Sequence, residues 1–357
     1  MSVIRIAEHA GVSIATVSRV LNNSRPVDPE IADRVRKSVA QLGMTKQVRR
    51  RNRVANRQPV TTLTIAIISL GRGYRDWFKL PVIAEVVAEL SRAAQELSMG
   101  VLISEMLTPS ELNPVLLRPE VRGSLVFISS DTPYTTRDVS VLQSRMPVVR
   151  VMGSQLAPTD VDHVSPDSTA IGHVASQYLL DSGLRELAYL TTRPSWEFSM
   201  QRGLGFLAGA CKSGIRPTVY LQDPDAAIPD VYGSNVVREA TLERLVDHMA
   251  QSKKKPFGLF VFCDAATAQV YPLLRARGLE PGRDVVVVSC DNESVRLSSL
   301  HPRPASIDLN SAEIAHLAVS RLARRISHRN ELPARILVNP RLVTGEIPGG
   351  LNAAFSG

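Results

Sequence analysis

The stretch "IAEHAGVSIATVSRVLNN", residues 6–23, holds two short helical patterns with a glycine between them. Gly11 follows the first pattern, and a glycine can adopt the left-handed conformation that ends a helix. Ser13 is suited to cap a second helix over residues 14–22, because its hydroxyl can accept hydrogen bonds from the first backbone N–H groups. The apolar residues that recur at helical spacing are Ile6, Ala7 and Ala10 in the first pattern and Val17, Val20 and Leu21 in the second. Two short helices around a glycine turn predict a helix-turn-helix.

A third helix is expected from Pro29 to about Leu42, with Asp28 as its N-cap and Gly43 at its end. Its predicted core stripe consists of Ile31, Val35, Val39 and Leu42. A unit of three short helices around one small core is therefore predicted for residues 1–45.

The outward face of the second helix has the chemistry of a DNA-reading surface, since that helix enters the major groove in a helix-turn-helix. Ile14 and Ala15 suit thymine methyl groups, and Arg19 can donate two hydrogen bonds to a guanine. Residues suited to phosphate contacts are Thr16, Ser18 and Asn22, and Ser13 is a further candidate DNA contact. The alternative is an ordinary three-helix bundle with a polar face, and the charge distribution argues against it.

Excess positive charge is confined to the first sixth of the chain. Residues 1–60 contain 12 basic and 4 acidic residues, whereas the remaining 297 residues contain 30 of each. A solvated basic arm would lack the helical periodicity and caps of this segment. A small folded basic module that binds a polyanion is the better interpretation.

The quoted stretch resembles the headpiece of the lactose-repressor/galactose-repressor family, with its pattern I-A-x-x-A-G-V-S-x-x-T-V-S-R-V-L-N. The matching residues are Ile6, Ala7, Ala10, Gly11, Val12, Ser13, Thr16, Val17, Ser18, Arg19, Val20, Leu21 and Asn22. The resemblance implies a transcriptional repressor that binds a near-palindromic, double-stranded operator as a homodimer. The C-terminal segment "GEIPGGLNAAFSG" lacks the leucine heptad of the family's tetramers, which favours a dimer.

The run "MTKQVRRRNRVANRQPV", residues 44–60, carries six basic side chains and no acidic one. It is either a solvated linker or a DNA contact. The family has a hinge helix here with the pattern Y-x-P-N-x-x-A-R-x-L, and only Arg51 matches it without a gap. We expect arginines to lie in or along a narrow minor groove in place of the family's apolar wedge. These candidate contacts are Arg49, Arg50, Arg51 and Arg53.

From Leu63 the pattern changes to apolar strands alternating with amphipathic helices, which is typical of parallel sheets covered on both faces. About ten strands in two runs predict two doubly wound α/β lobes. This part resembles the family's effector domain, which is akin to periplasmic sugar-binding proteins. The expected divisions are a headpiece over 1–45, a basic hinge over 46–61, the two-lobed domain over 62–346 and a tail over 347–357. The later expected helices cover 168–182, 200–213, 236–251 and 265–277.

Ligands of doubly wound sheets bind at the carboxyl ends of the strands, here between the lobes. Four segments resemble the family's effector-binding motifs: "SPDSTAIGHVASQYLLDSG", "QRGLGF", "FCDAATA" and "VVSCDNE". The resemblance assigns Asp167, Arg202, Asp264 and Asp291 to an effector site, with Trp196 in the loop before Arg202. Carboxylates and an arginine suit a sugar-like ligand, because each can bind two hydroxyl groups. The alternative for each aspartate is a helix N-cap, and Cys263 replaces the family's asparagine.

Other functions find little support in the sequence. It contains no G-x-x-x-x-G-K-[ST], H-E-x-x-H or G-x-S-x-G motif, and its seven histidines have no paired metal spacing. No catalytic residue, metal or cofactor is expected. An enzyme such as a sugar kinase fused to a DNA-binding headpiece is the main alternative, and a solute-binding protein is the next. The unpatterned cysteines Cys211, Cys263 and Cys290, the missing signal-peptide pattern and the lack of a long apolar run predict a cytoplasmic protein without a membrane span.

Overall fold

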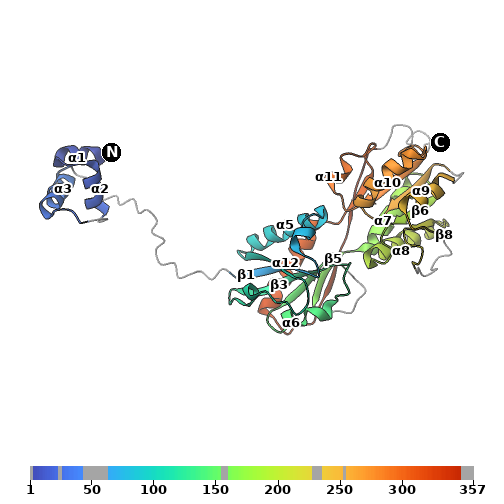
Figure 1. Ribbon diagram of the computed structural model, residues 1–357, viewed down its shortest axis with the longest axis horizontal. Helices are drawn as coiled ribbons and strands as arrows, with labels where there is room; N and C mark the ends of the chain where they lie inside the picture. Colours follow the sequence, from blue (N-terminus) through green and yellow to red (C-terminus); the bar gives the residue numbers. More distant parts are fainter. Residues whose placement is uncertain are drawn as a thin grey trace. The chain divides into compact units, whose positions relative to one another are not determined.

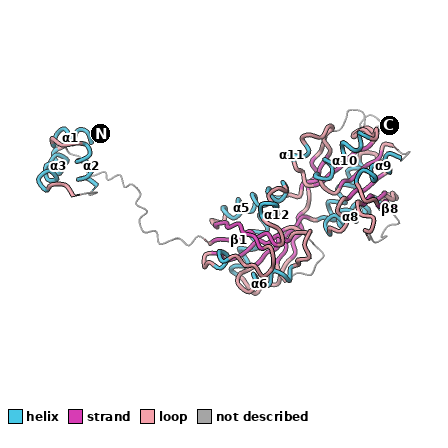
Figure 2. The backbone as a smooth tube through the Cα atoms, in the orientation of Figure 1, coloured by secondary structure: helices cyan, strands magenta, loops and turns pink. Residues whose placement is uncertain are grey.

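The computed structural model describes residues 3–22, 26–42, 63–153, 160–226, 235–251 and 255–346. The chain forms two compact units, Met1–Val60 and Thr61–Gly357 (Figure 1). The first unit is helical, and the second combines helices with strands (Figure 2). The predicted basic hinge and C-terminal tail lie outside the described residues.

The first unit is the predicted helix-turn-helix with a third helix: α1 (Val3–Ala10), α2 (Ile14–Asn22) and α3 (Pro29–Gln41). Gly11 has a φ of +64°, the left-handed conformation expected of it. The Ser13 hydroxyl accepts a hydrogen bond from the Thr16 N–H at 3.1 Å. Asp28 caps α3 by accepting from the Glu30 N–H at 2.9 Å. Both predicted caps are therefore confirmed.

The core of the first unit differs from the prediction in α3. Ile31 is only half-buried and lies outside the apolar cluster, whereas Ala32 and Ser38 are buried. Ser38 is tolerated inside because its hydroxyl pairs with His9 Nδ1 at 3.1 Å. Small side chains at these two positions rotate the buried face of α3 away from Ile31. The fully buried members of the cluster are Ile6, Ala7, Ala10, Val17 and Val35.

The first sheet of the second unit has six strands in the order β12-β5-β4-β3-β1-β2, and all its pairs are parallel. Its strands are β1 (Thr64–Leu70), β2 (Gly100–Met106), β3 (Val121–Ile128), β4 (Val148–Val151), β5 (Asp162–Pro166) and β12 (Arg335–Val338). One face packs on the helices α5 (Pro81–Glu96) and α12 (Ser311–Ser327). The other face packs on the short elements η1 (Pro114–Leu117), η2 (Thr136–Val139) and α6 (Ser140–Gln143). This sheet and its covering elements, with α4 (Tyr74–Trp77), form the first lobe.

The second sheet has seven strands in the order β13-β11-β10-β9-β6-β7-β8. Its strands are β6 (Leu187–Thr191), β7 (Thr218–Leu221), β8 (Asn235–Arg238), β9 (Phe257–Val261), β10 (Val285–Cys290), β11 (Ala305–Asp308) and β13 (Arg341–Val343). Only β13 is antiparallel to its neighbour. With the sheet, the second lobe contains α7 (Ser168–Asp181), α8 (Glu197–Lys212), α9 (Leu242–Gln251), α10 (Asp264–Ala276) and α11 (Ser294–Leu297). The expectation of two doubly wound lobes is confirmed.

The helix expected over residues 236–251 is wrong in its first part. Val236 and Val237 belong to β8 and pair in parallel with β7, as suits β-branched side chains on a sheet. The helix begins only at Leu242, and the Thr241 hydroxyl accepts from the Arg244 N–H at 3.4 Å near its start. Within the described residues there are thirteen strands, against about ten expected. The additional ones include the short strands β8, β12 and β13, which are largely exposed or half-buried.

The chain crosses between the lobes from β5 to α7, from β11 to α12 and from β12 to β13. The strands that lead into these crossings end at the junction of the lobes, so the carboxyl ends of both parallel sheets lie there (Figure 1). The opposite edge of the first sheet, where its strands begin, is called the amino edge below. In the described part of the chain, no helix is both long and apolar enough to cross a membrane.

Candidate functional site

The outward face of α2 presents the side chains expected to read DNA. Ile14 is 51% exposed, so its side chain is available for contact on this face. Ala15, Ser18 and Arg19 are also exposed. Ser13 is exposed as well, and its hydroxyl lies 2.9 Å from that of the half-buried Thr16. These two residues therefore stabilise the N-terminus of α2.

The remaining predicted DNA contacts lie outside the described structure. Asn22 ends α2, and its side chain is among the parts that are not described. The four arginines of the basic run, Arg49, Arg50, Arg51 and Arg53, fall in the undescribed segment 43–62.

A cavity of about 320 Å³ lies between the two lobes, and both contribute to its walls. Its polar lining comes largely from residues that directly follow strands, the position where a doubly wound sheet offers a ligand site. The polar lining residues of this kind are Arg72 after β1, Ser129 to Asp131 after β3, Thr192 and Arg193 after β6, Cys263 after β9 and Asp291 after β10.

Arg202 and Asp291 form an ion pair in the wall of this cavity. The Arg202 Nη2 donates to Asp291 Oδ1 at 3.1 Å, and Nη1 donates to the Phe262 carbonyl oxygen. The guanidinium lies 5.0 Å from the ring centroid of Phe198, within the range of a cation–π contact. Only 3% of the Arg202 side chain is exposed, so the pair holds a fixed geometry with little solvent around it.

The backbone around Asp291 adopts a conformation that residues other than glycine rarely take. Asp291 has a φ of +104° and Asn292 a φ of +52°. The Asp291 N–H donates to the Ile307 carbonyl at 2.9 Å, and the Asn292 N–H donates to the Ser306 hydroxyl at 3.0 Å. Strain held in this way by surrounding bonds is typical of functional sites. Burial raises the pKa of Asp291 to about 6, although Arg202 opposes the shift.

Asp167 and Asp264 do not line the cavity. Asp167 caps α7 by accepting from the Ala170 N–H at 2.8 Å. Asp264 is fully buried and accepts from the Ser306 hydroxyl at 2.9 Å and from the Glu293 N–H at 2.7 Å. Burial, reinforced by the nearby Asp291, raises the pKa of Asp264 to about 7. These two aspartates thus hold backbone segments next to the cavity in place through hydrogen bonds.

Trp196 lines the cavity and links its two walls. Its Nε1 donates to Asp131 Oδ1 at 3.1 Å, and Asp131 also pairs with Arg72 Nη2 at 3.2 Å. The Arg193 guanidinium lies 5.3 Å from the Trp196 ring centroid. Because Trp196 comes from the second lobe and Asp131 from the first, this hydrogen bond joins the lobes across the ligand space.

Other aromatic residues divide between the cavity and the surface. Trp77 lines the cavity and packs edge-on against Phe127 with centroids 4.7 Å apart. Tyr74 and Phe78, on either side of Trp77 in the chain, are exposed and contact each other with centroids 6.2 Å apart. Cys263 lines the cavity but makes no side-chain cap to α10, so the amide of the family's asparagine has no equivalent here.

Sequence reasoning missed several charged or polar lining residues. They are Arg72, Asp131, Arg193, Gln269, Glu293 and Arg296. The signal that would have found Arg72, Asp131 and Arg193 is their place just beyond the carboxyl end of a strand. Glu293 and Arg296 form a third ion pair in the lining.

The arrangement suits a polar ligand with apolar faces. Three ion pairs, Arg202–Asp291, Arg72–Asp131 and Arg296–Glu293, can exchange hydrogen bonds with hydroxyl groups, and aromatic rings offer flat apolar contact. Among the described residues, no group of three or more His, Cys, Asp or Glu side chains is placed to hold a metal ion.

Comparisons with known proteins agree with both parts of the molecule. Residues 5–46 match the family model "Bacterial regulatory proteins, lacI family", and residues 176–346 match "Periplasmic binding protein-like domain". The ribose operon repressor of Haemophilus influenzae is 25% identical, with 96% of each chain covered. The transcriptional repressor PurR of Mannheimia succiniciproducens is 22% identical, with 95% of this chain and 96% of that protein covered.

Solved structures show the same fold. The complex of the transcriptional regulator CelR with cellobiose has a TM-score of 0.63 at 20% identity and covers 98% of this chain and 100% of that one. The lac repressor dimer bound to operator and an anti-inducer has a TM-score of 0.60 at 19% identity and covers 97% of this chain and 98% of that one. The similarity to the two repressors named above extends over nearly the full length of both chains, through the helix-turn-helix and the two-lobed domain alike. The chain therefore joins a lacI-family DNA-binding domain to a periplasmic-binding-protein-like domain, and it is a DNA-binding transcriptional regulator.

Proposed function

We propose that this regulator is a repressor that binds a near-palindromic operator as a homodimer and responds to a small, carbohydrate-like effector held between its lobes. The observation that carries the proposal is the buried Arg202–Asp291 pair in the wall of a cavity between two lobes, in the same chain as a helix-turn-helix. A protein that acts on operator DNA in this way works in the cytoplasm.

The headpiece would read the operator through the outward face of α2. Ile14 and Ala15 suit thymine methyl groups, and Arg19 suits the major-groove edge of guanine. Ser13, Thr16, Ser18 and Asn22 suit phosphates or base edges. Arg49, Arg50, Arg51 and Arg53 would add contacts in or along the minor groove. A variant with alanine at 49, 50 and 51 that kept the wild-type salt dependence of binding would instead mark the run as a linker.

A carbohydrate matches the cavity because the lining alternates charged pairs with aromatic faces. A sugar presents adjacent hydroxyl groups, which a carboxylate or a guanidinium can bind two at a time. It also presents apolar C–H faces that suit Trp196 and Phe198. Among the similar solved structures is a regulator in complex with cellobiose, a disaccharide.

Effector control would follow from the position of the cavity between two lobes. A ligand that touches both walls favours lobe arrangements in which both walls reach it, and it shifts the population toward them. In a dimer, such a shift alters the operator affinity when the two arrangements present the headpieces differently.

The effector site can be tested after a carbohydrate screen by thermal shift has found a ligand. Asp291→Asn and Arg202→Ala should each weaken ligand binding by about tenfold to a hundredfold in calorimetry, since a hydrogen bond to a charged group is worth about 1.5–3 kcal/mol. Asp291→Asn keeps the shape of the side chain and guards against a folding defect in Arg202→Ala.

Arg92→Ala is the matched control, because Arg92 is an exposed arginine of α5 that pairs with Glu89 and Glu96 and does not line the cavity. It should bind the ligand like the wild type. Unchanged affinity in both Asp291→Asn and Arg202→Ala would remove the effector from this cavity.

A further inference from the structure

Four exposed arginines line one groove at the amino edge of the first sheet. Arg118, Arg122, Arg145 and Arg329 border a cavity of about 300 Å³ whose floor includes the buried Leu116, Val121 and Met146. They belong to different parts of the lobe, and Arg329 is far from the other three in the sequence. The charge balance of residues 61–357, which is neutral overall, therefore conceals a local concentration of positive charge.

In these guanidinium groups the ion pairing differs from that of several other exposed arginines of the second unit. Arg92, Arg283 and Arg324 each pair with a nearby carboxylate. Within the described part of the chain, none of the four groove arginines has a carboxylate at ion-pair distance. Because they line a single groove, their potentials add and create an attractive site for an anion.

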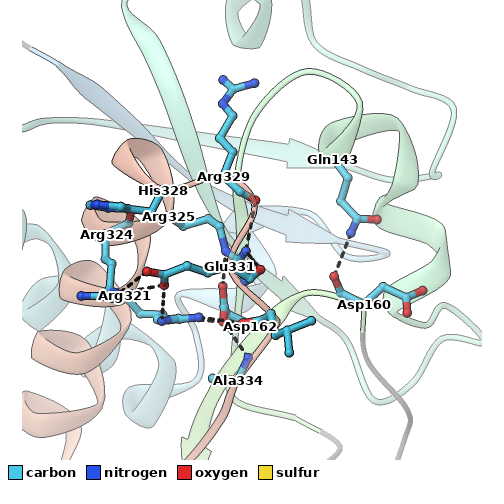
Figure 3. Close-up of polar contacts among 11 residues, drawn as sticks. Gln143, Asp160, Asp162, Arg321, Arg324, Arg325, His328, Arg329, Glu331 and Ala334 are labelled. Atoms are coloured by element: carbon cyan, nitrogen blue, oxygen red, sulfur yellow. Dashed lines mark hydrogen bonds and ion pairs between the residues drawn. The ribbon is translucent and has the colours of Figure 1, made fainter.

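The fold holds Arg329 in this position through a buried network. Asp162 at the start of β5 is fully buried and binds Arg321 Nε and Arg325 Nε, both at 2.7 Å. Arg325 Nη1 in turn donates to the Arg329 carbonyl oxygen at 3.2 Å and to that of Glu331. Figure 3 shows the Arg329 side chain directed away from this cluster, so the network fixes its backbone and leaves its guanidinium outside.

The groove lies beside the point where the chain enters the second unit. Thr64, the first residue of β1, pairs with Val121 in the floor of the groove. The Thr64 N–H donates to the Glu120 carbonyl at 2.9 Å, and Glu120 lies between the groove residues Pro119 and Val121. The segment 43–62, which carries the chain from the DNA-binding helices, thus joins the second unit at this edge and not at the edge that holds the effector cavity.

We propose that this arginine groove is a second DNA-contacting surface, which binds the phosphate backbone of the same duplex that the headpiece reads. The proposal rests on the DNA binding of the family and extends it to the effector-binding unit. Duplex DNA is the polyanion that the tethered headpiece brings to this edge, whereas nothing comparable brings an acidic protein. Contacts to phosphates add affinity and salt dependence but no sequence preference.

The test compares two variants that lose equal charge. The groove variant carries Arg118→Gln, Arg122→Gln, Arg145→Gln and Arg329→Gln. The control variant carries Arg185→Gln, Lys212→Gln, Arg216→Gln and Arg244→Gln, four exposed cations of the second lobe that line neither the groove nor the effector cavity. The probe is a duplex that the wild-type chain selects from a random pool, with its flanks retained, and the readout is fluorescence anisotropy over a range of salt concentrations.

In the groove variant, the log–log slope of affinity against salt should become less negative by about 0.9 for each phosphate that is no longer neutralised, which amounts to about 3.6 per protomer if all four arginines bind one. The preference for the selected duplex over a random one should stay unchanged, and the control variant should keep the wild-type slope. If the groove variant does not fold, Arg118→Gln and Arg329→Gln should each reduce the steepness of the slope by about 0.9.

Two results would overturn the proposal. An equal change in both variants would mean that net charge alone matters. An unchanged slope in the groove variant would leave the groove to an acidic protein surface. A wild-type chain that selected no duplex would instead contradict DNA binding itself. Failure of the groove proposal and failure of DNA binding therefore give different results.

Discussion

At the residue scale, burial of the Asp264 carboxyl group makes its contribution to stability depend on pH. It accepts hydrogen bonds from the Ser306 hydroxyl and the Glu293 backbone, and so holds together the start of α10 and the loop that carries Asp291. Burial raises its pKa from 3.8 to about 7. Because the folded state binds the proton more tightly than the unfolded state, the resulting stability is complete at low pH. It is lost progressively as the pH rises from 3.8 to about 7.

This sign gives a prediction for Asp264→Asn, which imitates the protonated carboxyl group. The free energy of unfolding of the wild type should fall from about pH 4 to about pH 7, whereas that of the variant should fall much less. Urea denaturation across this range measures both. Part of the wild-type slope comes from Asp291, whose pKa burial also raises, so Asp291→Asn is the matched comparison. Parallel curves for wild type and Asp264→Asn would show that Asp264 is charged throughout.

At the scale of elements, the contact between α7 and α8 positions Arg202. A Cβ atom at Gly172 would lie 2.0 Å from the Arg202 carbonyl oxygen, and one at Gly205 would lie 2.1 Å from that of Thr169. The two helix backbones therefore touch, and neither glycine can be replaced without moving a helix. Gly205 of "QRGLGF" serves this close packing, whereas Gly203 leaves room for the Tyr189 ring, whose Cε1 would lie 2.6 Å from a Cβ atom there.

Gly172→Ala and Gly205→Ala should each lower the free energy of unfolding by about 3 kcal/mol or more, since backbone atoms cannot move aside as a flexible side chain can. Urea denaturation measures the loss. Gly73→Ala is the control, because a Cβ there would lie at an ordinary 3.4 Å from Glu105 Oε2 and should cost far less. A Gly205→Ala protein as stable as Gly73→Ala would mean that the helices separate easily.

The burial of each strand explains which strands could be predicted from the sequence. β1 is mostly apolar because both faces of its sheet are covered, and it begins one residue after Leu63, where the apolar pattern of the sequence starts. β8 and β12 are largely exposed or half-buried, so they lack such a run and were missed. In the site, Asp167 and Asp291 both follow a strand. Asp167 caps a helix, whereas Asp291 lines the cavity. The difference comes from the positive φ at Asp291, which cannot be read from the fact that the residue is an aspartate.

At the scale of the whole second unit, effector control depends on the free-energy difference between lobe arrangements. Within the described residues, the links across the ligand space include the Trp196–Asp131 hydrogen bond and a 3.3 Å bond from the Val82 N–H to Glu293 Oε1. Each joins the first lobe to the second. A ligand can replace single hydrogen bonds of this kind. An effector can therefore shift the equilibrium between two arrangements of the lobes.

Trp196→Phe should shift this equilibrium while keeping an aromatic ring in the cavity. Loss of one hydrogen bond worth about 1 kcal/mol changes the ratio of two arrangements about fivefold. The distance between spin labels on the two lobes should increase or broaden in the ligand-free protein. Asp131→Ala, which removes the acceptor, tests the cause, because removal of both partners should add little to removal of one if their mutual bond is what links the lobes. Fully additive effects would assign the link to other contacts, and an unchanged distance distribution would show that the lobes are held together without Trp196.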